Sequence, residues 1–274
     1  MLLSSVIIIL REVLEAALLF SILIALSKHS GFDLRWIGWS LLTGLIGAVV
    51  YAQSIGVVSD WFEGVGQEVS NSLIQLTTYF MLVFYMALQL RFNHQQTDLK
   101  YSSGLLIKII MIIIAFLAIT REGSEIILYF FSVTHSEDHY VAVIIGMTIG
   151  ACIGISVGFL FYYLLINLTS KWAMNTGMVL LIMVSAGMVS QASLLLIQAD
   201  WLPSQLPIWN TTDWLSEKSA TGQLLYALIG YEATPTAIQA GLYLGGLLLP
   251  VFVIIILKYN LKKNSKPAFD FQEL

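Results

Sequence analysis

The chain has 274 residues, of which 58% are hydrophobic and 11% are charged, and its formal net charge is −4. Soluble domains carry about 25% charged residues, so this composition excludes an ordinary soluble domain and favours a membrane protein. The single cysteine, Cys152, excludes an internal disulfide framework and a Cys-x-x-Cys metal site. We expect membrane lipid around the chain and no nucleic-acid partner.

Seven apolar segments are long enough to cross a bilayer, which takes about 20 residues. They fall at about 2–27, 36–58, 69–91, 104–131, 140–168, 175–199 and 234–258. A further apolar stretch, 222–231, is too short to span and predicts a re-entrant or interfacial helix. The predicted fold is an all-α membrane protein with seven transmembrane helices. A single transmembrane domain covers 1–260, and 261–274 is a cytoplasmic tail.

Basic residues are unevenly divided between the two ends of these segments. Ten fall on one side, namely Lys28, Arg35, Arg91, Lys100, Lys108, Lys171, Lys258, Lys262, Lys263 and Lys266. Only Lys218 falls on the other side, and cytoplasmic connections are the ones enriched in Lys and Arg. We therefore expect the amino terminus outside and the carboxyl terminus in the cytoplasm.

The connections on the outer side are acidic. They carry Asp60, Glu63, Glu68, Glu137, Asp138, Asp200, Asp213, Glu217 and Glu232. An acidic vestibule would concentrate cations at its mouth. Alternatively, these loops simply lack Lys and Arg because they are exported, and both interpretations stay open at this point.

Two copies of Arg-Glu-x-x-Glu lie inside predicted spans. The first runs from Arg11 to Glu15 in the first span, and the second from Arg121 to Glu125 in the fourth. The first span runs inward and the fourth outward, so the motifs lie on antiparallel helices. In each case the next span carries small residues at every fourth position, which lets helices pack closely. These residues are Ser40, Gly44, Ala48, Ala52 and Gly56 in one span, and Gly146, Gly150, Gly154 and Gly158 in the other. We predict two inverted three-helix repeats plus a seventh helix, with the substrate site near the midplane.

The charges of the motifs predict a metal site. A charge at the centre of a membrane helix costs about 2.5–3.5 kcal/mol, so these groups must face inward and compensate one another. Residues three and four apart share a helix face, which lets each arginine pair with the second glutamate of its motif. Four carboxylates against two guanidinium groups leave about two negative charges, and carboxylate oxygens suit hard cations. The predicted ligands are Glu12, Glu15, Glu122 and Glu125, with Arg11 and Arg121 as supporting salt bridges.

A purely structural pair of salt bridges is the alternative. Buried ion pairs are a poor route to stability, and both motifs carry surplus negative charge, so a functional site is favoured.

The third segment carries a polar stripe at helical spacing. Its members are Glu68, Asn71, Gln75, Tyr79, Met86 and Gln89. A polar stripe in a span faces the bundle interior or water, so we predict a path for cations from the outer side. Hydrogen bonding between helices is an equal alternative.

At these residues the sequence resembles the oxidase-dependent iron permease family, which includes fungal high-affinity iron permeases and bacterial permeases of the EfeU type. The resemblance rests on the two motifs, is reinforced by the late segment 209–215, and covers nearly the whole chain. It implies a permease for iron uptake in the inner (plasma) membrane, with the motif glutamates as iron ligands. Iron would be substrate, with no other cofactor, and a partner outside would oxidise or deliver it. Asn71 stands where members of the family often carry a second acid.

Three other functions are compatible with parts of this pattern. A permease of the same build could carry another cation, such as lead or manganese. An intramembrane enzyme could use the glutamates as acid and base, but no His or nucleophile lies within a turn of either motif. A seven-helix sensor would need longer inner connections. We therefore expect a transporter rather than an enzyme.

Overall fold

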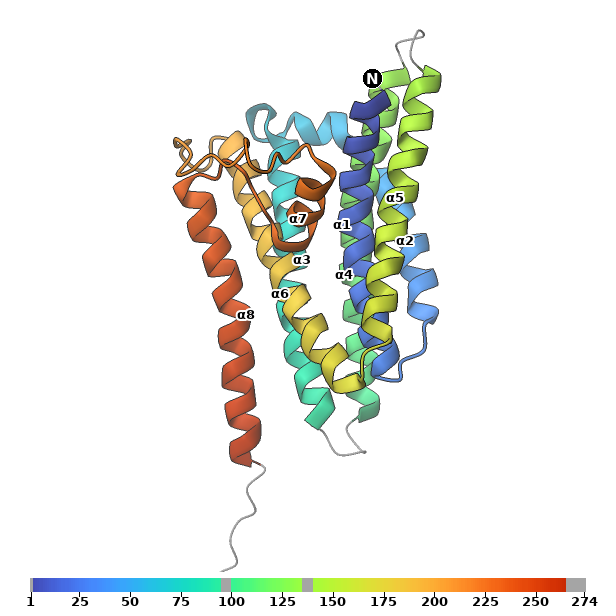
Figure 1. The fold of residues 1–274 in the computed structure, drawn as a ribbon, viewed down its shortest axis with the longest axis vertical. Helices are drawn as coiled ribbons and strands as arrows, with labels where there is room; N and C mark the ends of the chain where they lie inside the picture. The colour runs from blue at the N-terminus through green and yellow to red at the C-terminus, as the bar shows by residue number, and fades with distance from the viewer. Residues whose placement is uncertain (1, 95–99, 135–139, 265–274) are drawn as a thin grey trace, which may run out of the picture.

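The computed structural model describes residues 2–94, 100–134 and 140–264, and these ranges are almost entirely helical (Figure 1). The helices are α1 (Leu2–His29), α2 (Arg35–Ser59), η1 (Trp61–Gly64), α3 (Gly66–His94), α4 (Lys100–Thr134), α5 (Tyr140–Ile166), α6 (Ser170–Gln198), α7 (Ala220–Ile229) and α8 (Ala237–Asn264). No strand forms in these ranges, so the predicted all-α class is confirmed. Glu137, Asp138, Lys266 and the tail from 265 onward lie outside the described residues.

Six of the described helices are long and apolar enough to cross a membrane: α2, α3, α4, α5, α6 and α8. Their ends differ from the predicted ones by at most six residues. The 28 residues of α1 give it a length of about 42 Å, enough for a bilayer. However, Arg11, Glu12 and Glu15 interrupt its apolar stretch, so it is not one of these six. The chain is a multi-pass helical membrane protein.

The small-residue stripes bring pairs of helices into close contact. The stripe of α5 lies on α1, where a Cβ added at Gly150 would sit 3.0 Å from the amide nitrogen of Leu10. The stripe of α2 lies on α4, where a Cβ added at Gly44 would sit 2.7 Å from the Cβ of Ile119. Each stripe therefore packs against a helix that carries one of the charged motifs, as Figure 1 shows for α1 and α5.

The main apolar core occupies one end of the bundle. It is built from the carboxyl-terminal halves of α1 and α3 and the amino-terminal halves of α4 and α6, with Leu23, Leu82, Met111 and Leu181 fully buried. This end is the lower one in Figure 1, where α8 also ends. The bundle is thus closed by apolar packing between the charged motifs and that end.

The short helix α7 confirms the predicted short helical segment. The Ser219 side chain caps its start by accepting a hydrogen bond from the Gly222 amide (3.0 Å). Gly230 ends it in the left-handed region at φ 65°, which glycine adopts without strain. Gly187 of α6 meets this turn so closely that a Cβ there would sit 3.0 Å from the Cα of Gly230. Two glycines thus let the end of α7 rest directly on α6.

Candidate functional site

The two charged motifs meet in the interior of the bundle. Glu12 and Glu15 lie three positions apart on one face of α1 and are 6% and 9% exposed. Arg121 and Glu122 of α4 are 7% and 3% exposed. Burial of four ionisable side chains in one place is unusual, because each must find a partner there.

Three carboxylates form a cluster. Each of Glu12, Glu122 and Glu125 has an oxygen that lies within 4.8 Å of the other two, and no other such group of His, Cys, Asp or Glu occurs among the described residues. One oxygen each of Glu12 and Glu122 (Oε2) is buried without a hydrogen-bond partner there. Like charges this close repel strongly, so the arrangement suits a bound cation. We call these three residues the carboxylate cluster.

Arg121 lies at the centre of the site. Its Nη1 donates to Glu122 Oε1 at 2.6 Å and to Glu15 Oε2 at 3.3 Å. Its Nη2 is 3.4 Å from Glu125 Oε1, the pairing expected from their spacing of four. One guanidinium therefore joins carboxylates from both motifs. The position of Arg121 is that of the supporting salt bridge predicted from the sequence.

Arg11 has different surroundings. Its Nε donates to Glu15 Oε1 at 3.4 Å, and its Nη2 donates to the hydroxyl of Tyr226 on α7. The guanidinium also lies 4.0 Å from the centroid of the Tyr226 ring. The Arg11 side chain is 36% exposed, against 8% for Arg121. The two motifs have the same charged residues, but their arginines differ in burial and in hydrogen-bond partners.

Glu15 lies apart from the carboxylate cluster. Besides the two arginines, Gln191 of α6 donates to it, with Nε2 at 3.1 Å from Glu15 Oε2. Gln191 in turn accepts hydrogen bonds from Arg121 Nη1 (3.3 Å) and from Gln75 of α3. Of the four predicted ligands, the structure brings three together and links the fourth to a network of amides. Metal binding by all four stays a prediction.

The polar stripe of α3 faces the interior as expected. Asn71 donates to Glu125 Oε1 at 3.4 Å and accepts from the Tyr51 hydroxyl at 2.8 Å. Further along, the Tyr79 hydroxyl donates to the Gly246 carbonyl of α8 at 3.2 Å, which is hydrogen bonding between helices. The stripe therefore combines contact with the cluster and contact with α8.

The two ends of the stripe differ. Glu68 lies in the first turn of α3 and is partly exposed, whereas Met86 is fully buried in the apolar core. Glu125, beside Asn71, keeps 29% of its side chain exposed. A cation path along the stripe stays a prediction. Met86 lies beyond the charged site, in the part of the bundle closed by apolar packing.

Two residues of the site had not been identified from the sequence, namely Gln191 and Tyr226. Gln191 carried a usable signal, because an amide in the middle of an apolar span needs a partner inside the bundle. Tyr226 carried none, since its role depends on where α7 lies against α1.

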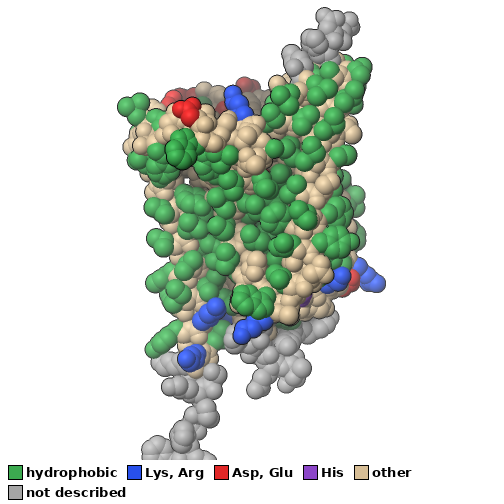
Figure 2. Space-filling view, in the orientation of Figure 1, with side chains coloured by type: hydrophobic (Ala, Val, Ile, Leu, Met, Phe, Trp, Pro, Cys, Tyr) green, Lys and Arg blue, Asp and Glu red, His purple; other side chains and the backbone are tan. Residues whose placement is uncertain are grey.

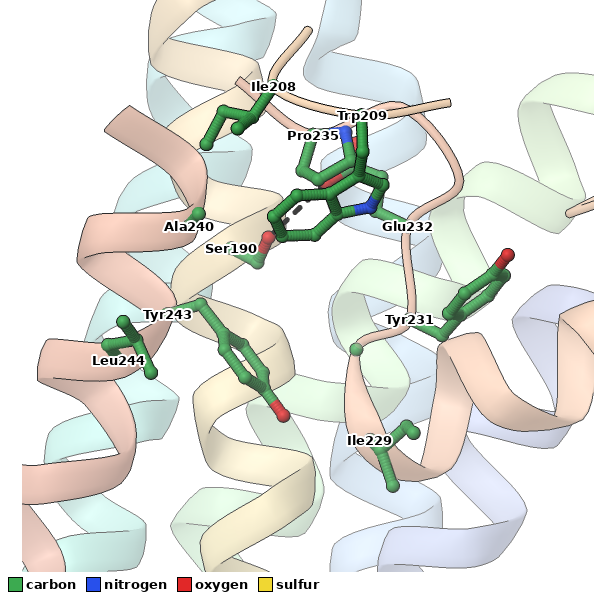
Figure 3. Close-up of a pocket in the computed structure, with 11 residues that line it drawn as sticks. Ser190, Ile208, Trp209, Ile229, Tyr231, Glu232, Pro235, Ala240, Tyr243 and Leu244 are labelled. Carbon is green, nitrogen blue, oxygen red and sulfur yellow. Dashed lines mark hydrogen bonds between the residues drawn. The ribbon is translucent and has the colours of Figure 1, made fainter. Parts of the chain in front are cut away.

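A cavity of about 530 Å³ lies apart from the cluster, between α6, α8 and the segment that joins α7 to α8 (Figure 3). Trp209 and Tyr243 line it together with Glu232. Glu232 Oε2 accepts from Ser190 at 3.4 Å, and Gln239 Nε2 is 3.0 and 3.1 Å from its two oxygens. Burial raises the pKa of Glu232 above its ordinary value of 4.5. A single carboxylate already held by these groups is not a second metal cluster.

Comparison with known proteins identifies the family. Residues 2–266 match the model of the iron permease FTR1 family. Ferrous iron permease EfeU of Escherichia coli O6:K15:H31 (strain 536 / UPEC) is 23% identical over 263 residues, which is 91% of this chain and 94% of that protein. The protein of the same name from Shigella sonnei (strain Ss046) is 23% identical over 249 residues, 86% and 89% of the two chains. No solved structure matches. The chain therefore belongs to the iron permease FTR1 family, whose members are transporters rather than enzymes.

Proposed function

We propose that this chain moves iron across the cytoplasmic membrane into the cell, and that iron binds among the glutamates of its two Arg-Glu-x-x-Glu motifs. The observation that carries the proposal is the carboxylate cluster, in which Glu12 of α1 meets Glu122 and Glu125 of α4 within 4.8 Å. Two of its buried oxygens lack a hydrogen-bond partner among the described residues. The similar proteins named ferrous iron permease support iron as the substrate.

The charge of the site favours a divalent ion. The four motif glutamates and two motif arginines sum to −2 when each is ionised. Three of the glutamates pair with the arginines, and Glu12 lies beside them in the carboxylate cluster. One ferrous ion neutralises that charge. Oxygen ligands without His or Cys favour iron or manganese over copper and zinc. Lead or manganese is the alternative cargo, and competition for uptake would distinguish them.

The membrane arrangement we propose has seven spans, with α1 as the first. Its length suffices, and its charges face partners in the bundle rather than lipid. The packing supports two inverted repeats, α1–α3 and α4–α6. The small-residue stripe of α5, in the second repeat, lies on α1, which carries the motif of the first repeat. The stripe of α2, in the first repeat, lies on α4, which carries the motif of the second. Such an exchange is expected when the repeats are related by a two-fold axis in the membrane plane.

We place the amino terminus outside and the carboxyl terminus in the cytoplasm. Figure 2 shows an apolar band across the visible face, with Lys and Arg mostly toward the lower end and Asp and Glu mostly toward the upper end. The lower end is the one at which α1 and α8 finish (Figure 1). An excess of Lys and Arg marks the cytoplasmic side. The apolar core then closes the inner side, and Glu125 is reached from the outer side past Asn71. An iron-oxidising or iron-delivering partner would act at that outer side.

The experiment is uptake of radiolabelled ferrous iron into proteoliposomes, with wild-type protein and single variants. Glu12→Gln, Glu122→Gln and Glu125→Gln each remove a charge from the cluster and are expected to abolish most uptake. Asp33→Asn is the matched control. It also removes one carboxylate charge, but Asp33 is exposed in the α1–α2 connection and is not part of the carboxylate cluster. Wild-type uptake by all three cluster variants would reject the proposed site.

A further inference from the structure

Glu15 differs from the other motif glutamates in its hydrogen bonds. Both of its oxygens already have donors, from Arg11 Nε (3.4 Å), Arg121 Nη1 (3.3 Å) and Gln191 Nε2 (3.1 Å). Glu12 and Glu122, by contrast, each keep a buried oxygen that has no hydrogen-bond partner among the described residues. Three donors occupy most of the roughly four lone-pair sites of the Glu15 carboxylate. Glu12 and Glu122 each offer a whole oxygen without a donor among the described residues, so a cation is better accommodated at the cluster than at Glu15.

Gln191 is held in one orientation by the chemistry of its neighbours. Its oxygen accepts from Arg121 Nη1 (3.3 Å) and from the amide of Gln75, and its nitrogen donates to Glu15. A reversed amide would set its N–H groups against the donors of Arg121 and its oxygen against a carboxylate. Gln191 is 7% exposed, so no bulk water would compensate for the mismatch.

We propose that Gln191 is a positioning residue of the iron site and that Glu15 is its hydrogen-bonding partner rather than an iron ligand. The proposal rests on the function proposed above. Gln191 and Glu15 fix the guanidinium of Arg121, and Arg121 orients Glu122 and Glu125. Iron is then held by Glu12, Glu122 and Glu125. Outer groups that orient metal ligands in this way typically account for about 10–100-fold in metal affinity.

The test exchanges the carboxylate and the amide between positions 15 and 191 of the full-length chain. Glu15→Gln alone places an amide N–H against donors, and Gln191→Glu alone places two carboxylates together. Each is expected to raise the KM for ferrous iron uptake by about tenfold. The double variant Glu15→Gln/Gln191→Glu again has one amide and one carboxylate with an unchanged net charge. Its KM is expected to return to within about threefold of wild type, since effects at contacting positions are not additive.

The matched control is Glu122→Gln/Gln191→Glu, which conserves net charge in the same way but removes a proposed ligand. It is expected to show no recovery. If the exchange at positions 15 and 191 is no better than its single variants at equal protein amounts, Glu15 is needed as a carboxylate at its own position and the proposal is wrong.

A second variant keeps the proposal testable if the exchanged protein does not accumulate in the membrane. Gln191→Leu removes only the amide and is expected to raise KM about tenfold at normal protein abundance. A wild-type KM for this variant would overturn the proposal. Failure of the proposed function itself would look different, because the single cluster variants Glu12→Gln, Glu122→Gln and Glu125→Gln would then transport normally.

Discussion

The two motif arginines predict unequal responses to the same substitution. Arg121 is 8% exposed and meets three carboxylates, Glu15, Glu122 and Glu125, at 2.6–3.4 Å. The Arg11 side chain is 36% exposed, and among the carboxylates of the described residues it pairs with Glu15 alone, at 3.4 Å, beside its contact with Tyr226. Arg121→Gln therefore leaves the buried carboxylates of Glu15 and Glu122, and the partly exposed one of Glu125, without their shared counter-ion. Arg11→Gln removes a partly hydrated partner from a carboxylate that Arg121 still neutralises.

The magnitudes follow from burial. Loss of one partner of a buried ion pair costs about 3–5 kcal/mol, whereas a solvent-screened pair is worth about 0–1 kcal/mol. The difference in unfolding free energy between the variants is thus about 3 kcal/mol. For domains of 150–250 residues, 1 kcal/mol shifts Tm by roughly 2–4 °C. We expect Arg121→Gln to lower Tm by at least about 6 °C more than Arg11→Gln.

Thermal unfolding of the purified protein in detergent is the assay, run with and without manganous ion as a stable divalent cation. A cation in the cluster replaces part of the missing positive charge, and a ligand at 100 times its Kd stabilises by about 2.7 kcal/mol. The ion should therefore raise the Tm of Arg121→Gln more than that of Arg11→Gln. Arg121→Lys is the control, since it keeps the positive charge but loses the planar guanidinium that donates to several carboxylates at once. Its Tm should lie between those of wild type and Arg121→Gln. Equal losses in the two glutamine variants would refute the reasoning.

Three further predictions follow from single positions. Gly230→Ala forces a left-handed residue at a cost of about 1–2 kcal/mol and directs a methyl group at Gly187, so both Tm and iron uptake should fall; unchanged values would show that α7 does not depend on this turn. Asn71→Leu removes the hydrogen bonds with Glu125 and Tyr51 and should raise the KM for iron by about fivefold, a loss of about 1 kcal/mol; a KM equal to that of wild type would remove Asn71 from the cation path. Burial raises the pKa of Glu232, so its stabilising effect is present below about pH 4.5 and is lost as pH rises through the raised value. Glu232→Gln should therefore gain Tm relative to wild type at pH 7 but not at pH 4, and a difference independent of pH would contradict this.

Contacts within one helix were predictable from the sequence, because helix geometry alone determines them. The spacing of four predicted pairing of Arg11 with Glu15 and of Arg121 with Glu125, and both pairs lie at 3.4 Å. The positions of the apolar segments were equally predictable, since each is long enough to cross a membrane. The residues at which the helices begin and end were harder to predict. Thus α6 begins at Ser170, earlier than the predicted 175, because a helix can continue past its apolar stretch through residues such as Lys171.

Contacts between helices were not predictable in the same way. Three of the four motif glutamates form the carboxylate cluster and Glu15 does not. Which glutamate is left out depends on how α1 is rotated about its axis relative to α4, and the spacing within a motif does not determine that rotation. Gln191 and Tyr226 themselves lie more than 60 residues after the second motif, on α6 and α7. Their contribution became visible only when the packing of α6 and α7 was known.

The inequality of the two motifs has a simple origin in the connections of the chain. Only five residues separate α3 from α4, whereas the segment between α6 and α8 is long enough to contain α7. This helix lies against α1 and α6, and its Tyr226 binds Arg11 of the first motif. Among the described residues no tyrosine pairs with Arg121, which is shared among three carboxylates instead. In the proposed pair of repeats, α7 is thus the added element that gives Arg11 an aromatic partner, while Arg121 stays at the centre of the site.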